Sequence, residues 1–119
     1  MRDIKFRAWD KTINYMDYRV RFSHFEDGIE VLDSWSSWRE LKKDEYELMQ
    51  YTGSKDSEGK EIYEGDILQS EHYFKYQVVF KGDCWRCEPV KNNHLKNRFI
   101  GNDLKVIGNI YQNKQLLED

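Results

Sequence analysis

The sequence has few of the residues that cross-link a chain, bend it or carry catalysis, with one proline, two cysteines and three histidines among 119 residues. No apolar run approaches the roughly 18 residues that a membrane-spanning helix needs, and there is no internal repeat or low-complexity tract. Charges at positions 2, 3, 5 and 7 leave no apolar core for a secretion signal. We therefore expect a cytoplasmic protein of one-domain size in which the cysteines stay reduced.

One stretch, LMQYTGSKDSEGKEIYEGDIL, is rich in glycine and acids but does not fit a ligand-binding loop. Its three glycines are six residues apart, too far for consecutive backbone amides to converge on a phosphate. A calcium loop that begins at Asp56 would place Lys60 at its fifth position, where an oxygen ligand is required. We expect instead two tight turns, at residues 55–60 and 64–66, with Gly59 at a positive φ angle.

The sequence offers little for metal, redox or hydrolytic chemistry. Cys84 and Cys87 form a CxxC pair, but no second pair of ligands follows at the spacing of a zinc site. On a strand the two thiols would project to opposite faces, which favours ordinary core or surface cysteines over zinc or redox roles. No Gly-x-Ser-x-Gly motif and no Ser/His/Asp grouping occurs. We expect no metal, no cofactor and no catalytic residue, and hence no enzymatic activity.

Aromatic and charged residues are abundant, at 15% and 34% of the chain. This composition is typical of a folded, β-rich domain with a charged surface. Apolar and polar residues alternate over residues 4–9 and 14–22, which predicts an N-terminal hairpin. Further short strands are predicted at residues 29–32, 45–51, 62–63, 67–68, 76–80, 84–90, 99–100 and 106–111.

A short helix is predicted in the N-terminal half. Asp33 or Ser34 can cap the start of a helix, and Trp35, Trp38 and Leu41 follow with the spacing of one helical face. We therefore expect an α+β protein that is mostly β.

Four blocks of the sequence, in order along nearly the whole chain, resemble the hallmark blocks of the YopX family of small bacteriophage and prophage proteins. They are IKFRAWD at residues 4–10, LMQYTG at 48–53, Asp56 with GKEIYEGDI at 59–67, and VIGNIY at 106–111. The resemblance implies a single YopX-like domain over residues 1–119, in which an N-terminal sheet with a short helix (residues 1–60) packs against a C-terminal SH3-like small β-barrel (residues 61–119). It implies a phage or prophage origin, but no reaction and no functional residue.

The C-terminal half carries a local excess of basic residues. Residues 72–105 hold seven Lys or Arg against three Asp or Glu, in a chain whose net charge is −3. Aromatic residues are interleaved with them, as on surfaces that stack nucleobases and neutralise phosphates. In alternating strands, however, such aromatics would face the core and the lysines would face the solvent. Nucleic-acid binding is therefore the alternative hypothesis, with candidate residues Phe74, Lys75, Lys81, Trp85, Arg86, Lys96 and Arg98.

Three large aromatic residues in the N-terminal half, Trp35, Trp38 and Tyr46, exceed what a short helix needs for its own burial. They either fill the space against the N-terminal sheet or form an exposed apolar patch that docks a partner or a second copy. The leading hypothesis is a non-enzymatic accessory protein that acts through protein contacts or self-assembly, with a homo-oligomer as one form.

Overall fold

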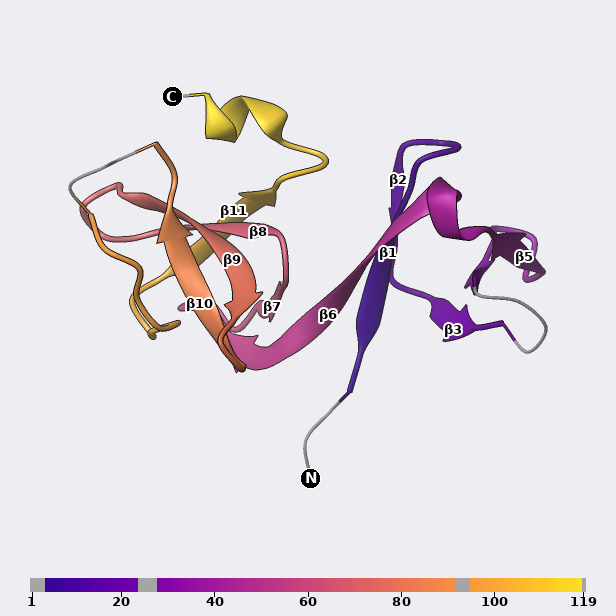
Figure 1. Ribbon diagram of the computed structural model, residues 1–119, viewed down its shortest axis with the longest axis horizontal. Helices are drawn as coiled ribbons and strands as arrows, with labels where there is room; N and C mark the ends of the chain where they lie inside the picture. Colours follow the sequence, from indigo (N-terminus) through magenta and orange to yellow (C-terminus); the bar gives the residue numbers. More distant parts are fainter. Residues whose placement is uncertain (1–3, 24–27, 92–94, 119) are drawn as a thin grey trace. The chain divides into compact units, whose positions relative to one another are not determined.

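The computed structural model describes residues 4–23, 28–91 and 95–118 (Figure 1). These residues form eleven β-strands and two 3-10 turns and contain no α-helix. The strands are β1 (Phe6–Asp10), β2 (Tyr15–Asp17), β3 (Val20–Phe22), β4 (Ile29–Leu32), β5 (Trp38–Leu41), β6 (Tyr46–Lys55), β7 (Glu61–Tyr63), β8 (Asp66–Gln69), β9 (Lys75–Lys81), β10 (Cys84–Pro89) and β11 (Lys105–Asn109); the 3-10 turns are η1 (Lys43–Glu45) and η2 (Lys114–Leu117).

The chain folds into two compact units, which we describe separately. The N-terminal unit comprises residues 5–50, and the C-terminal unit holds Ile4 and residues 51–118. The long strand β6 belongs to both (Figure 1). Its first half pairs with β1 in the N-terminal unit, and its Tyr51 and Lys55 pair with β7 in the C-terminal unit.

Antiparallel strand pairs build the N-terminal unit. Strand β1 lies between β2 and β6, and β4 lies between β3 and β5. Because side chains alternate between the two faces of a strand, the apolar residues of these short strands gather on one side. They meet in a small core of Ala8, Ile29, Val31 and Leu41, against which Val20, Tyr46 and Leu48 pack.

The C-terminal unit contains a four-stranded antiparallel sheet with the order β10-β9-β8-β11. Alternation along β9 buries Tyr76 and Val78, while Lys75 and Gln77 are only partly buried. The core of this unit comprises Ile62, Leu68, Tyr76, Val78, Cys87, Leu104 and Val106, with Trp85, Leu95 and Ile100 packed against it.

Asp56 ties the turn after β6 to β11. Its Oδ1 accepts hydrogen bonds from the backbone N–H groups of Glu58 (2.9 Å) and Lys60 (2.8 Å), and its Oδ2 accepts one from Val106 (2.9 Å). Burial alone would raise the pKa of Asp56, but the three backbone hydrogen bonds outweigh burial and hold the pKa below its usual value. The predicted turn, with Gly59 at a φ of +83°, is confirmed.

Two other buried polar side chains organise turns in the C-terminal unit. Asp66 accepts the backbone N–H of Tyr63 at 2.8 Å, across the predicted second turn, in which Gly65 has a φ of +86°. Asn109 accepts the backbone N–H of Tyr111 at 3.0 Å where the chain leaves β11. The polar residues of the YopX-like blocks therefore hold the chain at its turns.

The predicted short helix is wrong, and the α+β class is wrong with it. Trp38–Leu41 is strand β5 and pairs with β4. The carboxylate of Asp33, expected to cap a helix, accepts the N–H groups of Trp35 and Ser37, both at 2.9 Å. Ser36 then takes a left-handed φ of +63°, which reverses the chain into a hairpin. An Asp side chain accepts the same backbone hydrogen bonds at the start of a helix and in a tight turn. Asp33 was therefore compatible with a helix and with the hairpin turn that is observed.

The predicted β-rich character and the N-terminal hairpin of β1 and β2 are confirmed. Residues 14–22, predicted as one strand, form β2 and β3 instead, because Asp17 accepts the backbone N–H of Arg19 (2.8 Å) and turns the chain between them. Where an SH3-like barrel was predicted, the described residues form the four-stranded sheet whose edges are β10 and β11. The predicted strand at residues 99–100 is absent, and only Arg98 makes a bridge there, to Cys87.

Candidate protein-binding groove

One groove in the N-terminal unit combines exposed aromatic side chains with charged groups. Its volume is about 510 Å³, within the range of roughly 300–1,000 Å³ that is typical of ligand sites. Residues spaced two apart along β2 and its flanks line one part of it, and residues from the end of β4 to β5 line the rest. We call it the Trp35 groove, and its lining is Ile13, Tyr15, Asp17, Arg19, Leu32, Asp33, Ser34, Trp35 and Arg39.

The turn between β4 and β5 presents Trp35 on an ordered backbone. The N–H of Asp33 donates to the carbonyl of Ser37 at 2.8 Å, and the N–H of Ser36 donates to the carbonyl of Asp33 at 3.2 Å. The Asp33 carboxylate fixes two further backbone amides of the same turn. Trp35 is nevertheless 87% exposed. A large aromatic side chain on a fixed backbone costs little conformational entropy when it binds a partner.

A fully buried carboxylate anchors one of the two cations of the groove. Asp10 accepts a hydrogen bond from Nη2 of Arg39 at 2.5 Å, and its other oxygen accepts the N–H and the hydroxyl of Thr12 at 2.9 and 2.5 Å. Burial alone would raise the pKa of Asp10, but the bonds from Thr12 and Arg39 hold that pKa below its usual value. The Arg39 side chain is 38% exposed and lines the groove, and its guanidinium has N–H donors besides the one that binds Asp10.

Arg19 supplies the second cation. Its backbone N–H donates to Oδ1 of Asp17, and its Nε lies 3.7 Å from the same oxygen, too far for a hydrogen bond. The Arg19 side chain is 49% exposed. The groove therefore offers two guanidinium groups beside an exposed indole.

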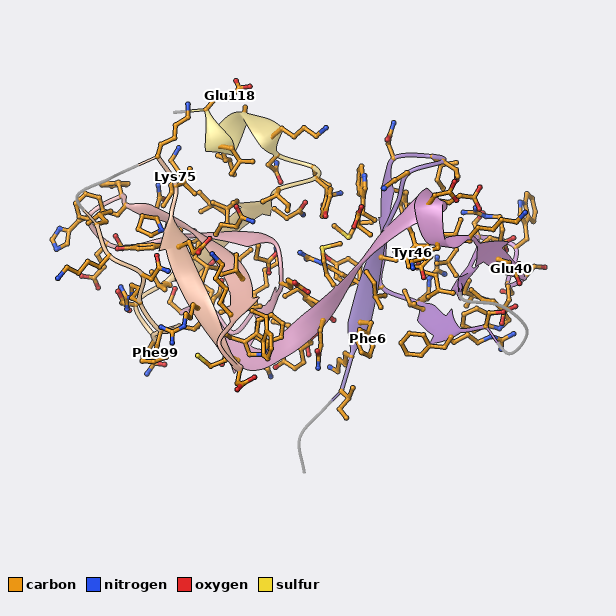
Figure 2. All side chains as sticks on the ribbon, viewed as in Figure 1. Phe6, Glu40, Tyr46, Lys75, Phe99 and Glu118 are labelled. Carbon is orange, nitrogen blue, oxygen red and sulfur yellow. The ribbon has the colours of Figure 1, made fainter. Side chains whose placement is uncertain are left out.

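The three aromatic residues predicted for a protein interface lie in different surroundings. Trp35 lines the groove. Trp38 carries the guanidinium of Arg21 over its ring, 3.9 Å from the centroid, and precedes Arg39 on β5, so it points to the opposite face. Tyr46, labelled in Figure 2, packs against the core of the N-terminal unit. Of the three, the structure brings Trp35 into the groove.

The residues predicted for nucleic-acid binding are divided between the two faces of the β9–β10 pair. Trp85 pairs with Phe80 on the face that carries the core, and the two rings contact each other edge to face at 4.9 Å. Strand alternation places Lys75, Lys81 and Arg86 on the other face. The basic and aromatic candidates on these strands therefore do not form one continuous surface.

Two of the predicted basic residues are paired with acids. Lys81 forms an ion pair with Glu88. Arg98 donates two hydrogen bonds to Asp103, at 3.0 and 2.7 Å. These bonds lower the pKa of Asp103 and raise that of Arg98. Their charges are largely balanced within the protein.

The remaining candidates lie outside the regular strands. Phe74 precedes β9, with its N–H bonded to the hydroxyl of Ser70 at 3.2 Å. Lys96 is exposed between β10 and β11.

The CxxC cysteines lie three residues apart on β10 and so project to opposite faces. Cys87 is buried, and burial raises the pKa of its thiol to about 11, which keeps it protonated. Across the described ranges, no group of three or more His, Cys, Asp or Glu side chains is arranged to hold a metal ion. No helix in the same ranges is long and apolar enough to cross a membrane.

Of the nine residues that line the groove, Trp35 alone was a sequence candidate for a binding site. The one local signal was the two-residue spacing of Ile13, Tyr15, Asp17 and Arg19, which marks one face of an extended segment. Nothing in the sequence near Arg39 indicates that it lies beside β2, because the fold creates that proximity.

Comparisons with known proteins agree with the YopX-like blocks. No curated protein matches the chain. Among solved structures, the crystal structure of protein EF1440 from Enterococcus faecalis has a TM-score of 0.69 and 26% sequence identity, covering 98% of this chain and 99% of that chain. The family model described as YopX protein matches residues 5–118. The chain therefore belongs to the YopX family.

Proposed function

We propose that this protein is a non-enzymatic accessory protein that acts through protein contacts made at the Trp35 groove. The observation that carries the proposal is an indole that is 87% exposed on a hydrogen-bonded turn, beside a groove with further apolar side chains. Exposed Trp and Arg residues dominate the binding energy of many protein interfaces, where truncation of one such side chain costs about 2 kcal/mol or more.

The chemistry of the groove supports binding over catalysis. Each groove carboxylate already accepts backbone N–H groups of its own turn: Asp17 accepts that of Arg19, and Asp33 accepts those of Trp35 and Ser37. Both carboxylates are therefore engaged in holding the backbone of their own turns. The groove lining also lacks a Cys, His or Lys side chain that would serve as a nucleophile or base.

Nucleic-acid binding has weaker support. Its candidate residues lie on different faces of the C-terminal unit, and Lys81 and Arg98 are paired with acids. An anion that displaced those acids would gain little net electrostatic energy. We therefore place the functional surface in the N-terminal unit, and we propose phage or prophage origin and a cytoplasmic location from the family's typical setting.

Affinity enrichment with matched variants tests the proposal. Tagged wild-type protein, Trp35→Ala and Tyr73→Ala are each incubated with lysate of the bacterium that carries the gene, with and without nuclease treatment, and bound proteins are quantified by mass spectrometry. Tyr73, 78% exposed in the C-terminal unit, controls for the loss of an exposed aromatic ring. Sedimentation of each purified protein measures self-association in parallel.

We expect at least one protein, or a second copy of the chain, to bind the wild type and Tyr73→Ala but to be reduced at least tenfold with Trp35→Ala. The same bound proteins and the same oligomeric state in all three samples would overturn the proposal. Enrichment that disappears on nuclease treatment would favour the nucleic-acid alternative instead.

A further inference from the structure

The charges of the Trp35 groove are unequally available to a ligand. Asp17 and Asp33 accept backbone N–H groups of their own turns through Oδ1, and the Asp17 side chain is only 6% exposed. Arg19 makes only a loose contact to Asp17, and Arg39 uses one nitrogen for Asp10. Most of the hydrogen-bond donors that line the groove therefore lie on two guanidinium groups, each with several N–H groups.

From this asymmetry we infer that the groove binds a short extended peptide segment in which one Asp or Glu is flanked by bulky apolar residues. This inference rests on the proposed function and names the partner's chemistry. The carboxylate would accept hydrogen bonds from Arg19 and Arg39, since a guanidinium binds carboxylates in a bidentate geometry. The apolar neighbours would contact Ile13, Tyr15 and Trp35, which are exposed and line the same groove.

The charge of the surrounding unit favours a single acidic group over a polyanion. Residues 5–50 contain eight Lys or Arg and ten Asp or Glu, a net charge of −2. A nucleic acid would bring many phosphates toward this negative unit, and the release of counterions at two arginines would offset little of that repulsion. A peptide with one carboxylate brings a single negative charge to the two guanidinium groups and so avoids the repulsion that many phosphates would meet.

The place of the groove in the fold favours an extended ligand. Strand β2 is the edge strand beside β1, and its Tyr15 and Asp17 line the groove. A peptide strand that adds to such an edge gains main-chain hydrogen bonds, and its alternate side chains point to the same face as Tyr15 and Asp17.

A displayed library of random nine-residue peptides, selected on the purified full chain, provides the probes. Recovered peptides are synthesised with the acid and with its amide (Asp→Asn or Glu→Gln), and their affinities are measured by isothermal titration calorimetry. The proteins are the wild type, Arg19→Gln, Trp35→Ala and two controls in the C-terminal unit, Arg86→Gln and Tyr73→Ala.

The expected result is a thermodynamic coupling between the acid and Arg19. The acidic peptide should bind about tenfold more weakly to Arg19→Gln than to the wild type. The amide peptide should bind the wild type and Arg19→Gln with equal affinity. Trp35→Ala should weaken both peptides about thirtyfold. The two C-terminal controls should match the wild type within twofold.

Peptides that depend on Trp35 but bind equally well as acid and amide would overturn this inference and leave the proposed function standing. If Trp35→Ala leaves the affinity of the selected peptides unchanged, or if no peptide is selected at all, the inference that the Trp35 groove binds such a peptide is overturned. Tighter binding of a labelled 20-nucleotide single strand than of the acidic peptide would overturn it in favour of nucleic acid. Dissociation of a dimer by Trp35→Ala, with no peptide bound by the wild type, would identify a second copy as the occupant.

Discussion

Removal of the Asp56 carboxylate should destabilise the C-terminal unit strongly. In Asp56→Ala, the N–H groups of Glu58, Lys60 and Val106 lose acceptors at 2.8 to 2.9 Å. The Val106 bond is buried and should cost about 2 kcal/mol, because a buried donor without a partner pays its full desolvation penalty. The two partly buried turn amides regain water and should cost about 0.5–1 kcal/mol each, for a total of about 3–4 kcal/mol.

Asp56→Asn separates these contributions. Asparagine keeps one carbonyl oxygen for the turn but presents an NH₂ group to the N–H of Val106, so the loss should be about 2 kcal/mol. Urea unfolding at neutral pH, followed by circular dichroism, measures both variants. Glu58→Gln is the matched control, because its exposed ion pair with Lys105 should contribute less than about 0.5 kcal/mol. A loss below 1 kcal/mol in Asp56→Ala would refute the assignment of Asp56 as the anchor of this turn.

Three further predictions concern both units. Gly28→Ala should destabilise the N-terminal unit by about 1–3 kcal/mol and speed amide hydrogen exchange in β4 and β5, since its Cβ would lie 2.5 Å from the backbone carbonyl oxygen of Leu41. Arg39→Gln should cost about 1–3 kcal/mol in thermal unfolding because it removes the cation from the buried carboxylate of Asp10, whereas unchanged stability would contradict that pairing. The folded-state pKa values of Asp10 and Asp56 lie below the unfolded value of about 3.9, so their stabilisation is complete above that pH and is lost as the pH falls through the folded pKa. Urea unfolding between about pH 5 and pH 2 should show this loss, with a shallower pH dependence for Asp56→Asn.

The parts of the fold that local chemistry decides were predictable from sequence. The turn around Gly59 and the turn at Gly65 followed from glycine's access to positive φ, and both are confirmed. The hairpin of β1 and β2 followed from alternation. The error at Trp38 had a physical cause: Asp33 provides the same hydrogen bonds to a helix start and to a hairpin turn, and only the left-handed Ser36 distinguishes them.

The groove depends on proximity that sequence patterns do not encode. Trp35 was a sequence candidate because it belongs to a group of large aromatic residues that exceeds what a short helix needs for its own burial. Its neighbours Tyr15 and Arg39 come from strands more than twenty residues apart in sequence, and only the packing of the N-terminal unit brings them together. Lys75, Trp85 and Arg98 do not share one surface for a similar reason. Composition does not fix which face of a strand each residue takes.

Site-specific photo-crosslinking in living cells tests the central claim most directly. A benzophenone amino acid replaces Trp35 in one protein and Tyr73 in another, and adducts formed on irradiation are identified by mass spectrometry. The groove proposal predicts a discrete adduct at position 35 with a protein or a second copy of the chain, resistant to nuclease and absent at position 73. No adduct at position 35, or the same adducts at both positions, would contradict the proposal that this protein acts through contacts at the Trp35 groove.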